Sequence, residues 1–568
     1  MGKNRTQQEY LFGFFLSLTF LFCKGQAFDT QEYEHINDFQ HQKIDSLFVN
    51  WTQPNYPGAV VGIMKGGELV FSKAYGLASL EYNVPNTTET LFNLASVSKQ
   101  FTAMGIVILE QEGKLSFDDD IRRHIPELPD FGETITIRNM LQHTSGLRSF
   151  HDLLALAGWR SGERRDNDDL YRLMLKQRDL NFTPGQEYAY SNTNYMLMVN
   201  VIEKITGEKF IDWMKRKVFQ PLGMKNTYIE DDYRRVVPNR ATSYYAYRGG
   251  IFRRVPEYWG YYGSANVHST TEDLLKWLIN FYKPRLGWET AFQTLLTRNR
   301  LNDGRENNSA FGVFVEDING YTRIAHDGST GGFKTFIGVY PEEKLNIVIL
   351  ANRSARPWDT AVEIADILLE ERESANKIID PSSIETIELS SEQIKKFEGS
   401  YWDEKNSRVR VMSVENDTLT ELKNNNLHFY PIDNNKFLIL EDTRTSTCEF
   451  IIEADGTKKM IRTYNDGKII ISESFNPNAI LKEDLSAYVG TYHSPELETI
   501  YSISLENEQL IAHHARHGDL EMRMPKKDIL LTKWPLRKVE ISRDENGIVN
   551  GFFATNGRVW NLWFEKQK

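Results

Sequence analysis

The chain has 568 residues, of which 40% are hydrophobic and 26% are charged, and its formal net charge is −11. This length is too great for one hydrophobic core, so we expect several domains. The composition excludes a disordered chain and a polytopic membrane protein. The acidic net charge argues against nucleic acid and against an anionic membrane surface as partners.

Residues 1–27 have the pattern of an export signal. Lys3 and Arg5 precede an apolar stretch, residues 11–22, that is too short to span a bilayer comfortably. Residues 25–27, Gly-Gln-Ala, then offer a cleavage site of the small-x-small type. We therefore expect an exported protein of the bacterial periplasm, without stable membrane insertion once the signal is cleaved.

Cys23 raises a second option, a lipoprotein anchor. Lipoprotein sites have a small residue directly before the cysteine, but here that residue is the bulky Phe22. We therefore favour ordinary cleavage after the signal. Cys448 is then the one cysteine left in the mature chain, which excludes an intrachain disulfide.

The first structural signal in the mature chain is a hairpin, predicted by β-rich runs at residues 58–64 and 68–75 around Lys65-Gly66-Gly67. The stretch Leu91–Thr102 follows and leads into an apolar run, residues 101–109, which predicts a buried helix.

Ser96 and Lys99 stand three residues apart at the start of that helix, so both side chains emerge on one face. A serine becomes a nucleophile when a neighbouring base takes its proton, and a neutral amine one turn away can do so. The field of a helix N-terminus disfavours an ammonium, and its free N–H groups can face an oxyanion. A second Ser-x-x-Lys, Ser374 to Lys377, lacks a following apolar helix, and we interpret it as solvated surface.

Residues 136–142 predict a short helix that is closed by His143-Thr144-Ser145-Gly146, a turn that we interpret as structural. Polar, helix-rich segments follow from residue 153 to residue 217. Within them, Tyr190-Ser191-Asn192 precedes an apolar helix at residues 195–205, so it lies on a loop held by rigid structure. A tyrosine beside a lysine can relay a proton and an amide can orient the lysine. The alternative is a tyrosine that only packs.

Strand patterns return at residues 310–315, 322–325, 333–340 and 345–351, and an amphipathic helix follows at 359–371. Strands at both ends with helices between them predict one sheet in an α+β domain.

His326-Asp327-Gly328 lies at the end of the second of these runs, and Ser329-Thr330-Gly331-Gly332 follows it. Glycines let the backbone approach a ligand closely, and the N–H of Ser329 could serve an oxyanion. The alternative is an ordinary polar turn between two strands.

Residues 377–391 are polar and unpatterned, as expected for a linker. Short alternating runs with Asn, Asp and Gly turns then predict all-β structure. Phe397-Glu398-Gly399-Ser400-Tyr401 recurs as Tyr488-Val489-Gly490-Thr491-Tyr492. This repeat indicates two related β modules, residues 392–480 and 481–568, each long enough for a small barrel.

Together these motifs resemble the serine β-lactamase and penicillin-binding superfamily, closest to class C β-lactamases and the related esterases and D-peptidases. The resemblance covers about Tyr56 to Leu369. Its motifs are Ser96-x-x-Lys99, His143-Thr144-Ser145-Gly146, Tyr190-x-Asn192, His326-x-Gly328 and Leu350-Ala351-Asn352-Arg353. It implies a β-lactamase/transpeptidase-like domain over residues 28–376, with an antiparallel sheet flanked by helices and a helical subdomain. Lipocalin-like barrel modules are expected to follow.

Carried over by position, the resemblance implies Ser96 as nucleophile, Lys99 as its base and Tyr190 as the second acid/base. Asn192 would be a positioning amide, and the N–H groups of Ser96 and Ser329 would form the oxyanion hole.

His326 and Gly328 stand where many members of the superfamily have Lys-Thr-Gly. A histidine is mostly uncharged near neutral pH, whereas a lysine offers a fixed charge to a substrate carboxylate. This departure favours esters, amides or peptides recognised through a free amine over penicillins. Arg353 is a candidate to restore a carboxylate contact, or else a surface residue. A Glu-x-x-Leu-Asn segment is missing, so strong β-lactamase activity is not expected.

The sequence thus predicts an exported serine hydrolase that forms an acyl-enzyme with a small-molecule or peptide substrate. Amides, esters and peptides that contain D-amino acids are favoured, because the two β modules resemble the architecture of D-aminopeptidases, in which a barrel loop can fill part of the cleft. No cofactor or metal is implied, since the sequence has no His-Glu-x-x-His, Cys-x-x-Cys or P-loop. The alternative is a penicillin-recognising protein that binds or senses cell-wall peptides with little turnover. The oligomeric state is open.

Overall fold

The computed structural model describes residues 36–160, 162–370, 372, 385–404, 408–415, 417–422, 427–441, 444–464, 469–477 and 485–568. The expected signal at residues 1–27 and the second Ser-x-x-Lys at residues 374–377 lie outside these ranges, as does much of the expected linker. The part from Ile36 onward forms a single compact unit.

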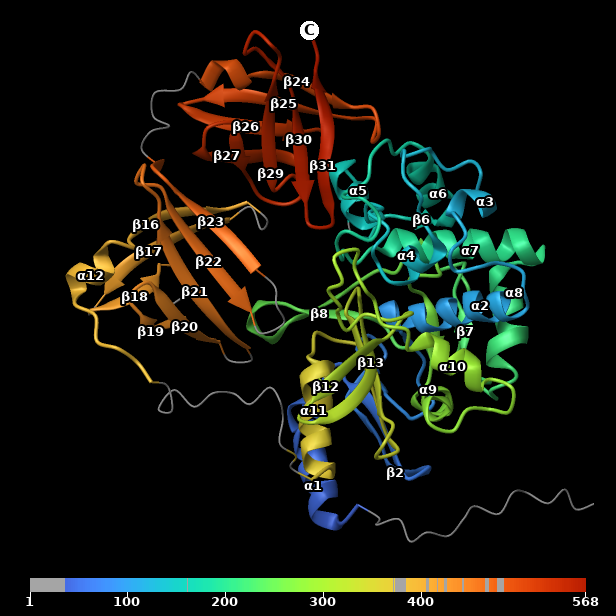
Figure 1. Ribbon diagram of the computed structural model, residues 1–568. Coiled ribbons are helices and arrows are strands. Elements are labelled where there is room, and N and C mark those ends of the chain that lie inside the picture. The colour runs from blue at the N-terminus through green and yellow to red at the C-terminus, as the bar shows by residue number, and fades with distance from the viewer. Residues whose placement is uncertain are drawn as a thin grey trace, which may run out of the picture. The chain divides into compact units, whose positions relative to one another are not determined.

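A six-stranded antiparallel sheet organises the first part of the chain (Figure 1), with the strand order β12-β13-β14-β15-β1-β2. Its strands are β1 Ala59–Lys65, β2 Glu68–Tyr75, β12 Phe314–Ile318, β13 Tyr321–Thr330, β14 Phe333–Tyr340 and β15 Leu345–Ala351. Ala59 of β1 lies opposite Ala351 of β15, so the N-terminal hairpin joins strands from the far end of the domain. The predicted α+β, β-lactamase-like fold is confirmed.

One predicted strand end is wrong. The strand expected at 322–325 continues to Thr330, because β13 stays paired with β14 until Thr330 opposes Phe333. His326 and Gly328 therefore lie inside a strand, and the turn is made by Gly331 and Gly332, of which Gly331 has a φ of +53°. The run expected at 310–315 also begins later, at Phe314.

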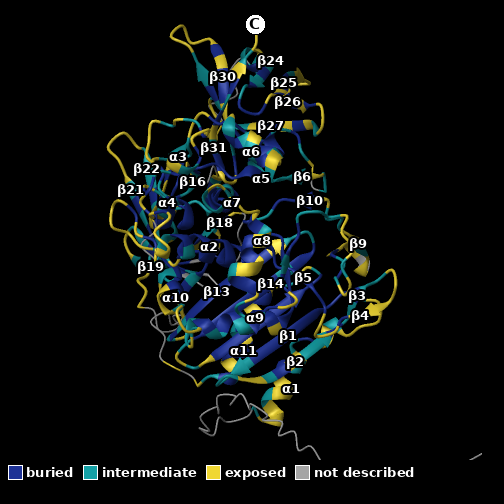
Figure 2. Cartoon of the chain, turned by 90° about the vertical axis from the view of Figure 1, so that its right-hand side faces the viewer, coloured by how far each residue is buried: buried dark blue, intermediate teal, exposed yellow. Residues whose placement is uncertain are grey.

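Helices cover both faces of the sheet, whose strands are largely buried (Figure 2). Alternate residues of β1 separate the two cores: Val61 packs with α1 and α11, whereas Val60 belongs to the larger core that contains α2 and α9. The helices are α1 Asp38–Ser46, α2 Lys99–Gln111, α3 Ile121–His124, α4 Ile137–Leu141, α5 Phe150–Leu156, α6 Asn167–Leu175, α7 Asn192–Thr206, α8 Phe210–Met214, α9 Thr271–Leu278, α10 Glu289–Leu295 and α11 Pro357–Leu368.

Short strands and turns connect these elements. The strands are β3 Leu77–Ser79, β4 Val84–Pro85, β5 Phe92–Asn93, β6 Arg165–Asp166, β7 Tyr228–Ile229, β8 Tyr244–Ala246, β9 Phe252–Arg254, β10 Trp259–Gly260 and β11 Val267–Ser269. The 3₁₀ turn η2, Ala95–Ser98, runs directly into α2.

Two eight-stranded β structures follow α12, Ser391–Lys395. The first is a sheet of β16 Gly399–Asp403, β17 Arg408–Glu415, β18 Thr418–Glu421, β19 His428–Asp433, β20 Lys436–Glu441, β21 Arg444–Ile452, β22 Lys458–Tyr464 and β23 Ile469–Phe475. The second is a closed barrel of β24 Gly490–Ser494, β25 Thr499–Glu506, β26 Gln509–His514, β27 Gly518–Lys526, β28 Ile529–Leu531, β29 Lys538–Arg543, β30 Val549–Asn556 and β31 Val559–Lys566. The predicted all-β modules are thus confirmed.

The repeated five-residue pattern has the same local structure in both modules. The Tyr401 hydroxyl donates to the Phe397 carbonyl at 2.7 Å, and the Tyr492 hydroxyl donates to the Tyr488 carbonyl at 2.7 Å. Each pattern opens the first strand of its module. The shared bond explains why a tyrosine ends both copies.

The closed barrel is joined to the hydrolase-like part by a buried ion pair. Arg148 Nη1 lies 2.8 Å from Glu496 Oε2, and each side chain is 1% exposed. The second nitrogen, Nη2, donates to the Asn561 carbonyl, and Glu496 also accepts from the Arg178 N–H. Burial raises the pKa of Glu496 and lowers that of Arg148, while their mutual attraction opposes both shifts.

Replacing Glu496 by alanine should lower the free energy of unfolding by about 3–5 kcal/mol, because the Arg148 guanidinium is left buried without its partner. Urea unfolding monitored by circular dichroism measures the loss. The double variant Arg148→Met/Glu496→Leu should recover most of it, since no charge is then buried. A single variant as stable as the parent would show that water reaches this pair.

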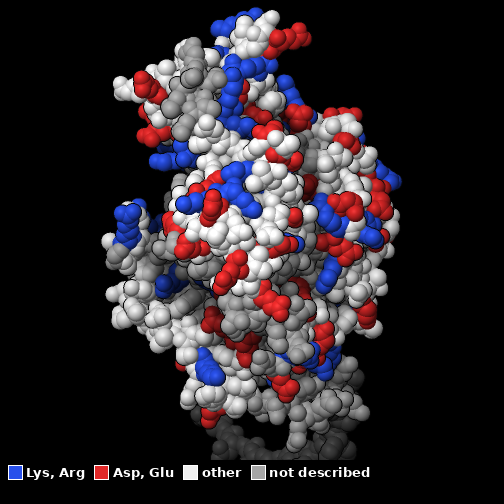
Figure 3. Space-filling model, turned by 60° about the vertical axis from the view of Figure 1, so that its left-hand side comes forward, with Lys and Arg blue, Asp and Glu red and all other residues white. Residues whose placement is uncertain are grey.

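The surface mixes charges of both signs. Acidic and basic side chains are interspersed over the face shown in Figure 3. No helix in the described ranges is long and apolar enough to cross a bilayer.

Candidate active site

Ser96 lies in the turn η2, immediately before α2. It is the one residue between positions 91 and 100 whose side chain is not buried. The preceding Ala95 has a φ of +49°, a left-handed conformation that is uncommon for a residue with a Cβ atom. The Ala95 N–H donates to Asn93 Oδ1 at 2.9 Å, which holds this turn to β5. The backbone therefore presents Ser96 outward from a rigid base.

Lys99 is completely buried beneath Ser96. Its Nζ lies 3.2 Å from Ser96 Oγ, 2.7 Å from Asn192 Oδ1 and 2.8 Å from the Ser264 carbonyl oxygen. Burial lowers the pKa of Lys99 well below its ordinary value, the Arg558 charge lowers it further, and Asp327 opposes the shift. The amine is thus held against the serine oxygen in an environment that favours its neutral form.

Tyr190 completes this group of side chains. Lys99 Nζ lies 4.8 Å from the centre of the Tyr190 ring. The phenol is buried, and its oxygen has no hydrogen-bond partner of good geometry among the described residues. Burial raises the pKa of Tyr190, and the neighbouring Ser96 opposes the rise. A hydroxyl held beside a serine and a lysine can accept or donate a proton during a reaction.

His143 supports Tyr190 from behind. Its Nδ1 accepts from the Ser191 N–H at 3.1 Å, its ring centre lies 4.3 Å from that of Tyr190, and its φ is +59°. Burial lowers the pKa of His143 well below its ordinary value. These contacts agree with the interpretation of His143–Gly146 as a structural turn.

The free edge of β13 lies against the Ser96 turn. Beyond Ala325 this strand has no partner on the β12 side among the described residues. A Cβ atom on Gly328 would lie 2.2 Å from the Leu94 carbonyl oxygen, so only glycine fits there. Ser329 is the next residue, and Lys334 Nζ donates to its Oγ at 2.5 Å.

His326 is buried on this strand, with its ring centre 6.2 Å from that of Tyr190. Its Nδ1 lies 2.5 Å from the Asp327 carbonyl oxygen. Burial lowers the pKa of His326 to about 4, although Asp327 opposes the shift. The structure therefore brings together all the residues that the sequence nominated: Ser96, Lys99, Tyr190, Asn192, His326, Gly328 and Ser329.

Sequence reasoning missed His151. Its Nδ1 lies 3.0 Å from Asn192 Nδ2 and its Nε2 lies 3.1 Å from the Tyr261 hydroxyl. These contacts orient the amide of Asn192 so that its oxygen faces Lys99. Nothing in the residues around position 151 distinguishes this histidine from a packing residue.

Arg558 was also missed. It belongs to the turn between β30 and β31 of the closed barrel, and its guanidinium carbon lies 4.7 Å from the centre of the Tyr190 ring. Arg353, considered above as a carboxylate contact or a surface residue, is half-buried, and a contact with a substrate carboxylate stays a prediction. Its guanidinium packs among the rings of Trp51, Tyr56 and Phe252, at 5.4–5.5 Å.

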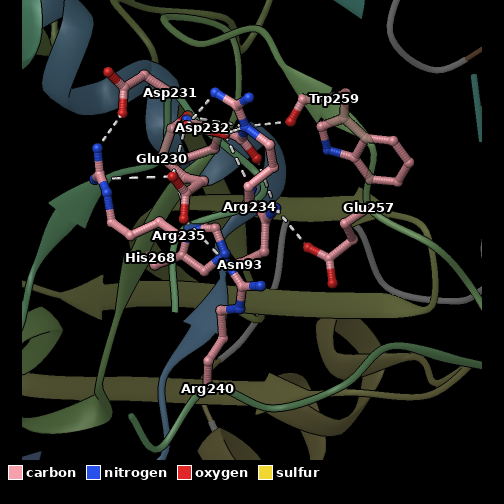
Figure 4. Close-up of polar contacts among 11 residues, drawn as sticks. Asn93, Glu230, Asp231, Asp232, Arg234, Arg235, Arg240, Glu257, Trp259 and His268 are labelled. Carbon is pink, nitrogen blue, oxygen red and sulfur yellow. Dashed lines mark hydrogen bonds and ion pairs between the residues drawn. The ribbon is translucent and has the colours of Figure 1, made fainter. Parts of the chain in front are cut away.

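A second polar cluster supports the Ser96 turn from below (Figure 4). Asn93 Nδ2 donates to Asn266 Oδ1 at 2.8 Å and lies 3.4 Å from Glu257 Oε2. Burial raises the pKa of Glu257 to about 7, and the Arg240 charge opposes the rise. The asparagine that fixes Ala95 is therefore itself fixed by a polar network.

The buried histidines of the site predict acid sensitivity. The pKa values of His143, His151 and His326 are all lowered, chiefly by burial, so between about pH 6.5 and 4 the unfolded chain binds protons that the folded chain does not. The free energy of unfolding should therefore fall with falling pH, by up to about 1.4 kcal/mol per pH unit for each histidine.

Denaturant unfolding at several pH values between 7 and 4.5 measures this slope. His326→Gln should flatten the slope relative to the parent, because one proton-binding group is removed. Parallel profiles for the two proteins would contradict the buried, neutral state of His326.

A partly exposed serine above a buried lysine, with a tyrosine on a neighbouring loop and a strand edge beside it, defines a serine hydrolase. Among the described residues no group of three or more His, Cys, Asp or Glu side chains is placed to hold a metal ion. Residues 39–371 match the family model described as "Beta-lactamase". This chain therefore belongs to the β-lactamase family, and the resemblance drawn from the motifs is confirmed.

Several known proteins are similar. Penicillin-binding protein 4* of Bacillus subtilis is 26% identical over 451 residues, which is 75% of this chain and 97% of that protein. Protein flp of Staphylococcus aureus is 29% identical over 338 residues, 58% of this chain and 66% of flp.

Solved structures share the fold. A penicillin-binding protein homologue from Pyrococcus abyssi has a TM-score of 0.53 at 24% identity and covers 76% of this chain and 99% of that one. A D-amino acid amidase from Ochrobactrum anthropi has a TM-score of 0.50 at 20% identity, with 58% and 99% covered.

Proposed function

We propose that this chain hydrolyses small peptides, amides or esters through an acyl-enzyme formed on Ser96. Ser96 Oγ attacks the carbonyl carbon while Lys99 Nζ takes its proton. Tyr190 then gives its proton to the leaving atom as the C–N or C–O bond breaks, and Lys99 passes the proton that it took from Ser96 to Tyr190. Water then attacks the acyl-enzyme and loses a proton to the same side chains, which return a proton to Ser96 Oγ. This step releases the acid and restores Ser96.

The observation that carries this proposal is the environment of Lys99. An exposed lysine is protonated at neutral pH and cannot accept a proton, but burial favours the neutral amine. Asn192 and the Ser264 carbonyl fix that amine at 3.2 Å from Ser96 Oγ. A protein that only bound its ligand would have no use for this costly burial.

The oxyanion is assigned to the backbone N–H groups of Ser96 and Ser329. The close approach of Gly328 to the turn before Ser96 supports this assignment, since it brings the two segments together. Developing negative charge would be met there by fixed donors without reorganisation.

The charge state of His326 determines which class of substrate we favour. His326 is neutral near pH 7, so this residue offers no fixed positive charge to a substrate carboxylate. We favour substrates that contain D-amino acids, in line with the penicillin-binding relative and with the architecture of two β modules, and we expect weak or no hydrolysis of β-lactams. Export through residues 1–27, the domain limits at 28–376, 392–480 and 481–568, and the absence of a nucleic-acid partner stay predictions.

The test combines labelling with turnover. The protein is incubated with a fluorophosphonate or a penicillin, and the adduct is mapped by mass spectrometry. Hydrolysis is then measured for D- and L-alanine amides, D-alanyl-D-alanine peptides and short-chain esters. An adduct on Ser96 together with turnover supports the proposal. A stable penicilloyl adduct without turnover would support the alternative of a binding or sensing protein, and no adduct would overturn both.

A further inference from the structure

The turn between β30 and β31 brings a cation from the closed barrel to the candidate active site. The Arg558 guanidinium carbon lies 4.7 Å from the centre of the Tyr190 ring, and the residue is exposed. Its charge lowers the pKa of Lys99 and of Tyr190, which places it within the same electrostatic environment.

The backbone of this turn is fixed in place. The Arg558 N–H donates to Asp152 Oδ2 at 3.3 Å, and the Arg558 carbonyl accepts from the Ser149 N–H at 3.3 Å and from Asn181 Nδ2 at 3.0 Å. Gly557 has a φ of +55°, and a Cβ atom there would lie 3.1 Å from Asp152 Oδ1. The hairpin is thus seated on the hydrolase-like part through main-chain contacts, which leaves the Arg558 side chain available.

The guanidinium of Arg558 forms no ion pair with an acidic side chain in the described part of the chain, although its charge opposes the rise that burial causes in the pKa of the neighbouring Asp152. Among the described residues the Arg558 side chain makes no hydrogen bond or ion pair. Its guanidinium makes a cation–π contact with the Tyr190 ring. The carboxylate of Asp152 is engaged by the backbone N–H instead. Two cations close to Ser96 have other partners, because Lys99 is bonded on three sides and Lys334 donates to Ser329 Oγ.

There is room beside the turn. A pocket of about 1080 Å³ borders it and is lined by Glu187, Arg523, Trp534, Gly557 and Trp560 among others. Arg558 itself is exposed, so the planar fork of donors that a guanidinium presents to carboxylates is accessible from solvent.

We propose that Arg558 is a specificity determinant that binds a carboxylate on the leaving portion of the substrate. This inference rests on the proposed function, because Tyr190 is the group assigned to protonate the leaving atom and Arg558 lies against its ring. The hairpin of the barrel thereby supplies the fixed positive charge that His326 does not.

A matched pair of substrates tests this assignment. Both are thioesters of one N-acyl-D-alanine; the leaving group of the first is mercaptoacetate, and that of the second is its uncharged methyl ester. The parent protein should show a higher kcat/KM for the anionic thioester. Arg558→Ala and Arg558→Gln should lower kcat/KM for the anionic thioester about 10- to 100-fold more than for the neutral one.

The ratio of the two kcat/KM values is the decisive quantity. Loss of the Arg558 charge also raises the pKa of Lys99, which slows both thioesters together at low pH but leaves their ratio unchanged. Arg558→Lys should keep part of the preference, since it retains the charge without the fork of donors. Arg523→Ala, which removes another exposed cation of the closed barrel, is the matched control and should leave the ratio unchanged.

The two proposals fail in different ways. If the parent hydrolyses neither thioester, the proposed function is wrong and this inference falls with it. If the parent hydrolyses both and the ratio is the same in Arg558→Ala and Arg558→Gln, or follows Arg523 instead, the proposed function stands and the role of Arg558 is overturned.

Discussion

Ser96→Ala is expected to lower kcat/KM for every ester or amide substrate by a factor on the order of 10⁴ or more. The variant loses the atom that forms the covalent intermediate, whereas Lys99 and Tyr190 have no other nucleophile to activate. Folding should be unchanged, because the Ser96 side chain is partly exposed and its hydroxyl supports no other element of the fold. Steady-state kinetics and covalent labelling with a fluorophosphonate measure the effect.

Ser72→Ala is a suitable control for the Ser96 variant, since Ser72 is an exposed serine of β2 outside the site. It should keep full activity and full labelling. Labelling that persists in Ser96→Ala with undiminished turnover would assign the nucleophile to another residue.

Asn192→Asp should move the acidic limb of the pH–rate profile toward higher pH. The new carboxylate would lie about where Oδ1 now sits, 2.7 Å from Lys99 Nζ. An opposite charge at this distance stabilises the ammonium and raises its pKa by roughly 1–3 units. At pH values where the amine is mostly protonated in both proteins, kcat/KM should be roughly 10- to 1000-fold lower in Asn192→Asp, and it should recover as the pH is raised.

Asn192→Leu distinguishes the effect of the added negative charge from the effect of losing the amide. It removes the hydrogen-bond acceptor without adding a carboxylate, so activity should fall without an upward shift of the limb. If the acidic limb of the pH–rate profile lies at the same pH in Asn192→Asp and in the parent, Lys99 is not the group that must lose its proton.

The central sheet could be predicted where hydrophobic runs are continuous. Residues 333–340 and 345–351 are buried on both faces, and their predicted limits coincide with β14 and β15. The end of β13 could not be predicted in this way, because its Asp, Gly, Ser and Thr residues resemble a turn. The pairing of residues 327–330 with residues 333–336 of β14 keeps this segment in the sheet.

The residues of the candidate site also divide into those that local sequence could predict and those that it could not. Ser96, Lys99, Tyr190 and His326 lie in short motifs, so local sequence was sufficient to nominate them. Arg558 could not be nominated, because its contact with Tyr190 depends on how the closed barrel packs on the hydrolase-like part. Arg353 shows the same limit: its place after a strand is ordinary, and only the folded structure packs three aromatic rings around it.

The β30–β31 turn brings Arg558 to the Tyr190 ring, and this has a consequence for how the substrate preference of the protein could evolve. Its proposed bond-breaking groups and its proposed selectivity are encoded in separate stretches of the gene, and the second is a turn in which the Arg558 side chain is exposed. Substitution at one hairpin tip could therefore redirect the enzyme to a new class of leaving group while the reaction itself is inherited intact.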